Sequence, residues 1–204
     1  MALYKSTNSL TPVVKNLLIA NVLVFIAQLY FSSIDRPLEL YGALWPVRSG
    51  NFKVWQLVTY MFMHAGWMHL IFNMIGLYMF GMTLENFWGS KRFLQFYIIC
   101  GLIAGGTQLA LQGGSLYSLG ASGAIMGILA GFAYLFPNTE LYIYFIPIPV
   151  KAKYAISGFI LLDLFGAVVP REGDQIGHYA HLGGALAGLI IVILWNRTNR
   201  KNFY

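Results

Sequence analysis

Long apolar runs alternate with short polar segments along most of the chain. A helix that crosses the hydrocarbon core of a membrane needs roughly 20 mostly apolar residues. Six runs come near that length, with the fourth and fifth short: Pro12 to Phe31, Trp67 to Phe87, Phe93 to Leu111, Ala121 to Phe136, Ala152 to Val169 and Tyr179 to Trp195. The pattern predicts an all-α polytopic membrane protein, a six-helix bundle formed by one domain over residues 1–204.

Composition agrees with this prediction. Hydrophobic residues make up 58% of the chain and charged residues only 10%, whereas about a quarter of an average soluble domain is charged. The first apolar run is long, and Ser32 to Asp35 offers no small-residue cleavage site, so we expect a retained helix and not a cleaved signal peptide.

The basic residues predict the orientation. Cytoplasmic loops of membrane proteins carry an excess of Lys and Arg. With the N-terminus in the cytoplasm, nine of the thirteen basic residues face inward, namely Lys5, Lys15, Lys91, Arg92, Lys151, Lys153, Arg197, Arg200 and Lys201. We therefore expect both termini in the cytoplasm. The cations are spread over several loops and form no basic stripe, so no nucleic-acid partner is expected.

Two connections stand out by composition. The longest one, residues 32–66, is rich in aromatic residues and is expected to lie half in the membrane interface. The inner connection after the fourth run contains Pro147 and Pro149, which disfavour a helix there.

Polar side chains inside the apolar runs are the candidates for function, because such residues are expensive in hydrocarbon. Ser122 lies in the stretch Gly120-Ala121-Ser122-Gly123, where the fourth run begins. The free N–H groups of a helix start favour developing negative charge, which suits a nucleophilic serine. A plain helix N-cap is the alternative role for Ser122.

A nucleophilic serine needs a base, and His181 is the best candidate. Glycines spaced four apart follow both residues: Gly123 and Gly127 in the fourth run, and Gly184 and Gly188 in the sixth. Small-residue faces let two membrane helices approach closely. Packing of these two faces against each other would bring His181 beside Ser122.

The second run adds two polar side chains on one helix face. His69 and Asn73 are four residues apart. Both are hydrogen-bond donors, and together with the backbone N–H of Ser122 they would stabilise an oxyanion. An interhelical hydrogen bond that only holds the bundle together is the alternative for Asn73.

The remaining polar residues carry weaker signals. Asp163 is either the acid of a catalytic triad or a structural, partly hydrated carboxylate, and His178 is a second, less favoured candidate for the base. Glu85 and Arg92 flank an inner loop and are expected to pair, and His64 is expected to order the loop before the second run. The histidines match no zinc-binding motif, so no metal and no other cofactor is expected.

Three ordered motifs carry a resemblance to a known family. HxxxN at His69 to Asn73, GxSG at Gly120 to Gly123 and AHxxGxxxG at Ala180 to Gly188 lie on the second, fourth and sixth runs. In this combination the chain resembles the rhomboid intramembrane serine proteases, of the six-helix bacterial type. The resemblance covers nearly the whole chain and implies the bacterial inner (plasma) membrane as its location.

The resemblance implies a Ser-His dyad without a third acid, in which Ser122 is the nucleophile and His181 the general base. This would argue against a triad role for Asp163. The implied reaction is hydrolysis of peptide bonds in or next to transmembrane helices of single-span or polytopic substrates, without metal or cofactor.

The resemblance also implies an oxyanion hole made of the side chains of His69 and Asn73 and the backbone N–H groups of Ala121 and Ser122. Two positions depart from the family pattern. Gln56 follows Trp55 where an arginine is frequent, and Met126 stands where an aromatic residue often packs under the histidine.

Two other classes of function remain as alternatives. A pseudoenzyme of the same fold would lack the serine or the histidine, but Ser122 and His181 are both present. A small transporter or channel that uses His69, Asn73 and Asp163 as a polar path would lose function on Asp163→Asn and keep it on Ser122→Ala. The protease hypothesis predicts the reverse.

Overall fold

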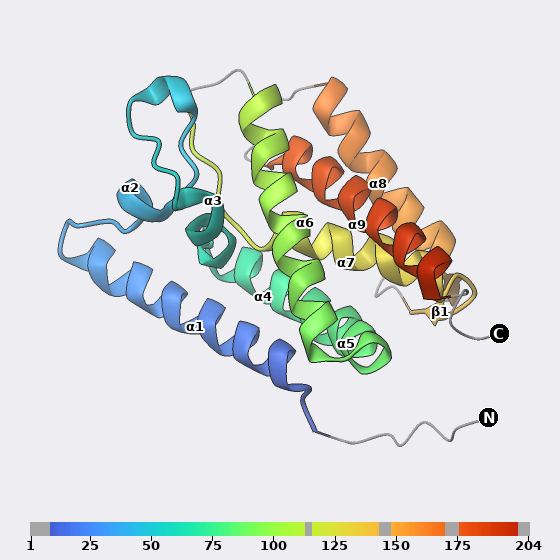
Figure 1. Cartoon of the computed structure of the whole chain (residues 1–204). Helices are drawn as coiled ribbons and strands as arrows, with labels where there is room; N and C mark the ends of the chain where they lie inside the picture. The colour runs from blue at the N-terminus through green and yellow to red at the C-terminus, as the bar shows by residue number, and fades with distance from the viewer. Residues whose placement is uncertain (1–8, 113–115, 143–147, 170–175, 200–204) are drawn as a thin grey trace.

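The computed structural model describes residues 9–112, 116–142, 148–169 and 176–199. Helices occupy all six apolar runs (Figure 1). Their bounds are α1 Pro12–Ser33, α4 Trp67–Gly76 continued by η3 Leu77–Gly81 and α5 Met82–Trp88, α6 Ser90–Leu111, α7 Ser122–Leu135, α8 Ala152–Val168 and α9 His178–Asn199. The expectation of a mainly helical protein is therefore confirmed.

Four of these helices are long and apolar enough to cross a membrane. They are Pro12–Ser33, Trp67–Trp88, Ser90–Leu111 and His178–Arg197. α7 has 14 residues and α8 has 17, which are short for the roughly 20 residues of a typical span. The chain is thus a multi-pass membrane protein by these four helices, and the count of six spans stays a prediction.

α7 lies in the interior, between α6 and α9 (Figure 1). A Cβ added to Gly127 would lie 2.6 Å from Cys100 Sγ of α6 and 3.0 Å from the carbonyl oxygen of Gly184 in α9. Nine of the fourteen residues of α7 are buried, among them Ile128, which has no exposed surface. Close packing against the side chains of α6 and the backbone of α9 thus fixes the helix whose first residue is Ser122.

Large apolar side chains cover the outer surface of the bundle. Leu23 on α1, Phe72 on α4 and Leu162 on α8 are each at least 60% exposed. In water such a surface would be unfavourable, whereas in a bilayer these side chains contact lipid.

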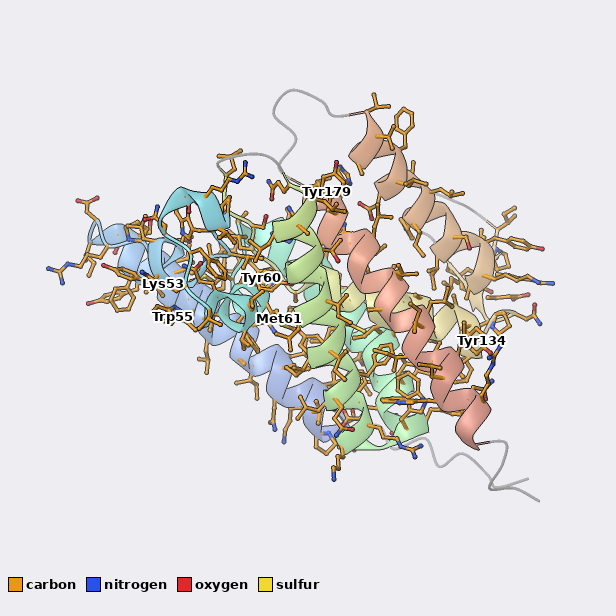
Figure 2. All side chains as sticks on the ribbon, turned by 45° about the horizontal axis from the view of Figure 1, so that its top comes forward. Lys53, Trp55, Tyr60, Met61, Tyr134 and Tyr179 are labelled. Atoms are coloured by element: carbon orange, nitrogen blue, oxygen red, sulfur yellow. The ribbon has the colours of Figure 1, made fainter. Side chains whose placement is uncertain are left out.

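The long connection between the first two runs folds into short helices, α2 Glu39–Gly42, η1 Val47–Ser49, α3 Gln56–Thr59 and η2 Tyr60–Phe62. Tyr60 and Met61 pack against α6, as Figure 2 shows, and the Tyr60 hydroxyl donates to the carbonyl of Gly101 at 2.7 Å. Gln56 is fully buried: its side-chain oxygen accepts from Lys53 N–H and its amide donates to the carbonyl of Asn51, both at 3.1 Å. Gln56 therefore orders this connection by neutral hydrogen bonds and without an ion pair.

The expected pairing of Glu85 with Arg92 is wrong. The Glu85 carboxylate accepts hydrogen bonds from the backbone N–H groups of Val13 and Val14, at 2.9 and 2.8 Å, and from the Ser90 hydroxyl at 2.6 Å. The first N–H groups of a helix have no intrahelical acceptor, so Glu85 supplies one and anchors the start of α1 to the middle of α5.

Two short backbone pairings depart from the all-α prediction. β1 Glu140–Leu141 and β2 Val150–Lys151 form a small antiparallel ladder in the connection between α7 and α8. Pro149 precedes β2, and Pro147 lies outside the described residues. Leu44 and Ser118 also form an isolated bridge, which joins the long connection to the segment before α7.

Candidate active site

Ser122 and His181, which are 59 residues apart in sequence, are joined by a hydrogen bond. The distance from Ser122 Oγ to His181 Nε2 is 2.7 Å. Ser122 is the first residue of α7, and His181 lies in the first turn of α9. The contact exists because α7 and α9 touch backbone to backbone, and a Cβ added to Gly184 would lie 1.8 Å from the carbonyl oxygen of Gly123.

Ser122 does not act as a helix N-cap. The cap position of α7 is Ala121, and no side chain caps this helix end. The N–H groups of the first turn have no intrahelical acceptor, so they point out of the helix start beside the Ser122 hydroxyl. This arrangement offers backbone donors to a negatively charged oxygen that forms next to Oγ.

Gln108 on α6 positions the start of α9, a role that was not predicted from the sequence. Its side-chain oxygen accepts from Ala180 N–H at 2.9 Å, and its amide donates to Ser118 Oγ at 2.9 Å. Gln108 is 3% exposed. Its position as a strongly polar residue inside the third apolar run is the signal that could have identified it.

The imidazole of His69 lies against the backbone of Gly120, two residues before Ser122. A Cβ added to Gly120 would lie 2.8 Å from His69 Nε2 and 3.5 Å from Ser122 Oγ. The N–H of Ala65 donates to His69 Nδ1 at 3.3 Å. Because a neutral imidazole that accepts at Nδ1 carries its proton at Nε2, His69 offers an Nε2–H donor on the side that faces Gly120.

Asn73 is buried, and its amide donates to the carbonyl of His69 in its own helix at 2.7 Å. The amide carries a second N–H, so a role in an oxyanion hole stays a prediction for Asn73.

His64 supports this region from the preceding loop. Its ring meets that of His69 edge to face with centroids 5.1 Å apart, and its backbone N–H donates to Gln28 Oε1 of α1 at 2.9 Å. Burial, and to a lesser degree the proximity of His69, lowers the pKa of His64 to about 4. His64 therefore carries no charge at neutral pH, and it joins the loop to α1.

Asp163 on α8 contacts both histidines of α9. Its Oδ1 atom lies 3.0 Å from His181 Nδ1 and 2.7 Å from His178 Nδ1. The three side chains are 13 to 17% exposed. The hydrogen bond to Ser122 is made by His181, so the geometry favours His181 over His178 as a base. No group of three or more His, Cys, Asp or Glu side chains in the described part of the chain is arranged to hold a metal ion.

Met126 lies one turn below Ser122 and is 7% exposed. It packs with Ala130 of α7, Ala185 of α9 and the partly buried Ile160 of α8. The thioether therefore fills the space where α7, α8 and α9 meet beneath the two catalytic candidates.

Comparison with known proteins gives a consistent result. The family model of the rhomboid domain matches residues 51–197. Rhomboid-like protease 3 of Toxoplasma gondii is 29% identical over 80% of this chain and 60% of its own length. RHOMBOID-like protein 6, mitochondrial, of Arabidopsis thaliana is 35% identical over 76% of this chain and 48% of its own.

A bacterial relative also matches: Rhomboid protease GlpG of Haemophilus influenzae is 27% identical over 68% of both chains. The chain spans less than two thirds of the length of the Toxoplasma and Arabidopsis relatives. Because relatives named as mitochondrial are among the matches, the comparisons do not support the expected bacterial inner membrane as the location.

Proposed function

Because this chain belongs to the rhomboid family, we propose that it is an intramembrane serine endopeptidase in which Ser122 is the nucleophile and His181 the general base. The observation that carries the proposal is the 2.7 Å hydrogen bond between Ser122 Oγ and His181 Nε2 at the start of the interior helix α7. A serine becomes nucleophilic when an adjacent base accepts its proton.

The reaction proceeds in two halves. Ser122 Oγ attacks the carbonyl carbon of the scissile peptide bond as His181 Nε2 accepts the hydroxyl proton. His181 then gives this proton to the leaving amine, which departs and leaves an ester on Ser122. Water, deprotonated by His181, attacks the ester, and the proton returns to Ser122 Oγ as the new carboxylic acid is released.

The negative oxygen of each tetrahedral intermediate needs hydrogen-bond donors. The backbone N–H groups of Ala121 and Ser122 and the Nε2–H of His69 are the donors we assign, and Asn73 would join them if its second N–H turned toward the site. In other serine hydrolases, loss of one such donor costs about 10²- to 10³-fold in kcat.

The substrates we propose are single-span or polytopic membrane proteins. Backbone groups in hydrocarbon are satisfied by the helix itself, so a substrate helix must unwind locally before its carbonyl reaches Ser122. Segments with small, helix-weakening residues in or next to a transmembrane helix suit this requirement. The proposed reaction uses no metal or organic cofactor.

The test is cleavage of a single-span model substrate by the full chain in liposomes, together with labelling by a fluorophosphonate. We expect cleavage and labelling by wild type, neither by Ser122→Ala, and no cleavage by His181→Ala. Ser157→Ala is the matched control, since Ser157 is an exposed serine of α8, and it should retain wild-type rates. Cleavage that persists in Ser122→Ala would overturn the proposal, as would a folded wild type that neither cleaves nor labels.

A further inference from the structure

The third polar group beside the proposed dyad is a carboxylate on a different helix. Asp163 Oδ1 is 3.0 Å from His181 Nδ1, and His181 Nε2 is in turn 2.7 Å from Ser122 Oγ. Carboxylate, imidazole and hydroxyl therefore form a continuous hydrogen-bonded chain across α8, α9 and α7. In departure from the dyad without a third acid that the resemblance implies, we propose that Asp163 is a positioning residue, which fixes the Nδ1–H form of His181 and directs its Nε2 lone pair at Ser122. This inference rests on the function proposed above.

The proton positions follow from the hydrogen bonds. A neutral imidazole has one N–H donor and one acceptor nitrogen. Ser122 Oγ–H needs an acceptor at Nε2, so Nδ1 must carry the proton, and the carboxylate oxygen is the acceptor that favours this form. When His181 takes the serine proton, both of its nitrogens carry hydrogen, and the negative charge of Asp163 stabilises the resulting cation.

His178 fixes the direction of the carboxylate. Its Nδ1 lies 2.7 Å from the same Oδ1 atom. Its ring packs against the backbone of α8, where a Cβ added to Gly166 would lie 2.4 Å from His178 Nε2. A side chain hydrogen-bonded from two directions loses rotamer freedom, so Oδ1 stays within reach of His181. A supporting partner of this kind is common around functional histidines.

A purely structural role for Asp163 makes a different prediction. The buried residues of α8 are Ala152, Ala155 and Ile156, all in the first half of the helix. Polar contacts help to hold its second half to α9, including the hydrogen bond of Tyr179 Oη to the carbonyl of Ala167 at 3.3 Å. If Asp163 only joined the two helices, loss of its carboxylate would lower the unfolding temperature together with kcat, whereas loss of a positioning role lowers kcat at a nearly unchanged unfolding temperature.

The matched pair of variants is Asp163→Asn and His178→Phe. The first keeps the size of the side chain and removes its charge. The second removes the hydrogen bond between His178 and Asp163, while an aromatic ring still covers Gly166. The readouts are kcat and KM for the liposome substrate, the rate of fluorophosphonate labelling, and the unfolding temperature in detergent.

We expect Asp163→Asn to lower kcat and the labelling rate by at least about 100-fold with KM changed less than about threefold, because a carboxylate partner of a catalytic histidine affects the chemical step. In His178→Phe, kcat should fall by less than about tenfold. A kcat for Asp163→Asn within about threefold of wild type would overturn the inference, and so would equal losses of kcat in both variants.

A spectroscopic readout does not depend on turnover. In protein with ¹⁵N-labelled histidine, the Nδ1–H proton of His181 should give a strongly downfield resonance that is absent in His181→Ala. It should be lost or shifted upfield in Asp163→Asn and kept in His178→Phe. An unchanged resonance in Asp163→Asn would overturn the inference. Failure of the proposed protease function can be distinguished from failure of this inference, because in the first case cleavage would persist in Ser122→Ala.

Discussion

The backbone of Gly120 lies directly against the imidazole of His69, so that a side chain at residue 120 would occupy the place of the ring. An added Cβ would be 2.8 Å from both Nε2 and Cε1 of His69. The φ angle of Gly120 is +129°, in a region that residues with a side chain rarely adopt. Gly120 thus allows the proposed oxyanion donor and the proposed nucleophile to lie side by side.

Gly120→Ala should therefore impair the site more than the fold. We expect kcat to fall by about 10²-fold, because displacement of His69 removes an oxyanion donor. Gly50→Ala is the control, since Gly50 also has a positive φ of +76° but has nothing within 4 Å of an added Cβ. It should cost about 1 kcal/mol of stability and leave kcat unchanged. Equal kcat in both variants would contradict this account of Gly120.

Gly184 should be the most sensitive glycine of α9. An added Cβ would lie 1.8 Å from the carbonyl oxygen of Gly123, so Gly184→Ala must push α9 away from α7 and separate His181 from Ser122. We expect both a lower unfolding temperature in detergent and loss of cleavage. Gly106→Ala on α6 meets no atom within 4 Å and should be neutral or stabilising by about 0.5–1 kcal/mol. A stable, active Gly184→Ala protein would contradict the observed packing.

The sequence could predict the helices and the meeting of α7 with α9, because both depend on local signals. The length of each apolar run indicates a helix, and glycines spaced four residues apart indicate the faces along which α7 and α9 pack. The predicted third helix began too late, since Gly89, with φ +81°, turns the chain within one residue and α6 begins at Ser90.

The partners of carboxylates could not be predicted in the same way. Arg92 was the obvious partner for Glu85 by proximity in sequence, but the Glu85 carboxylate binds the Ser90 hydroxyl and two N–H groups that are 71 and 72 residues away. The position of Asp163 beside His181 depends on how α8 is rotated against α9, and the sequence of α8 does not specify that rotation because apolar residues surround Asp163. If Asp163 positions His181 as we propose, Asp163→Asn impairs a protease as well as a transporter, and Ser122→Ala is the variant that separates these two functions.

Removal of the Glu85 carboxylate should loosen the start of α1. Glu85→Ala leaves the N–H groups of Val13 and Val14 without their acceptor, which we expect to cost roughly 3 kcal/mol, measured as unfolding free energy in mixed detergent. Glu85→Gln, which keeps one accepting oxygen, should lose less. Glu140→Ala is the control, because Glu140 is exposed on β1. An Ala variant at Glu85 as stable as this control would contradict the capping role.

Acidification should destabilise the protein through His64. Its pKa is about 4 in the folded protein against 6.5 for an ordinary histidine, so between these values the unfolded chain binds a proton that the folded chain does not. Stability is therefore highest above about pH 6.5 and falls as the pH is lowered toward 4, by up to about 3 kcal/mol from this one group.

The measurement is the unfolding temperature in detergent from pH 7.5 to 4.5 for wild type and His64→Leu. Other groups titrate in both proteins, so the difference between the two curves isolates His64. The variant should lose less stability on acidification, and parallel curves would contradict a buried, neutral His64.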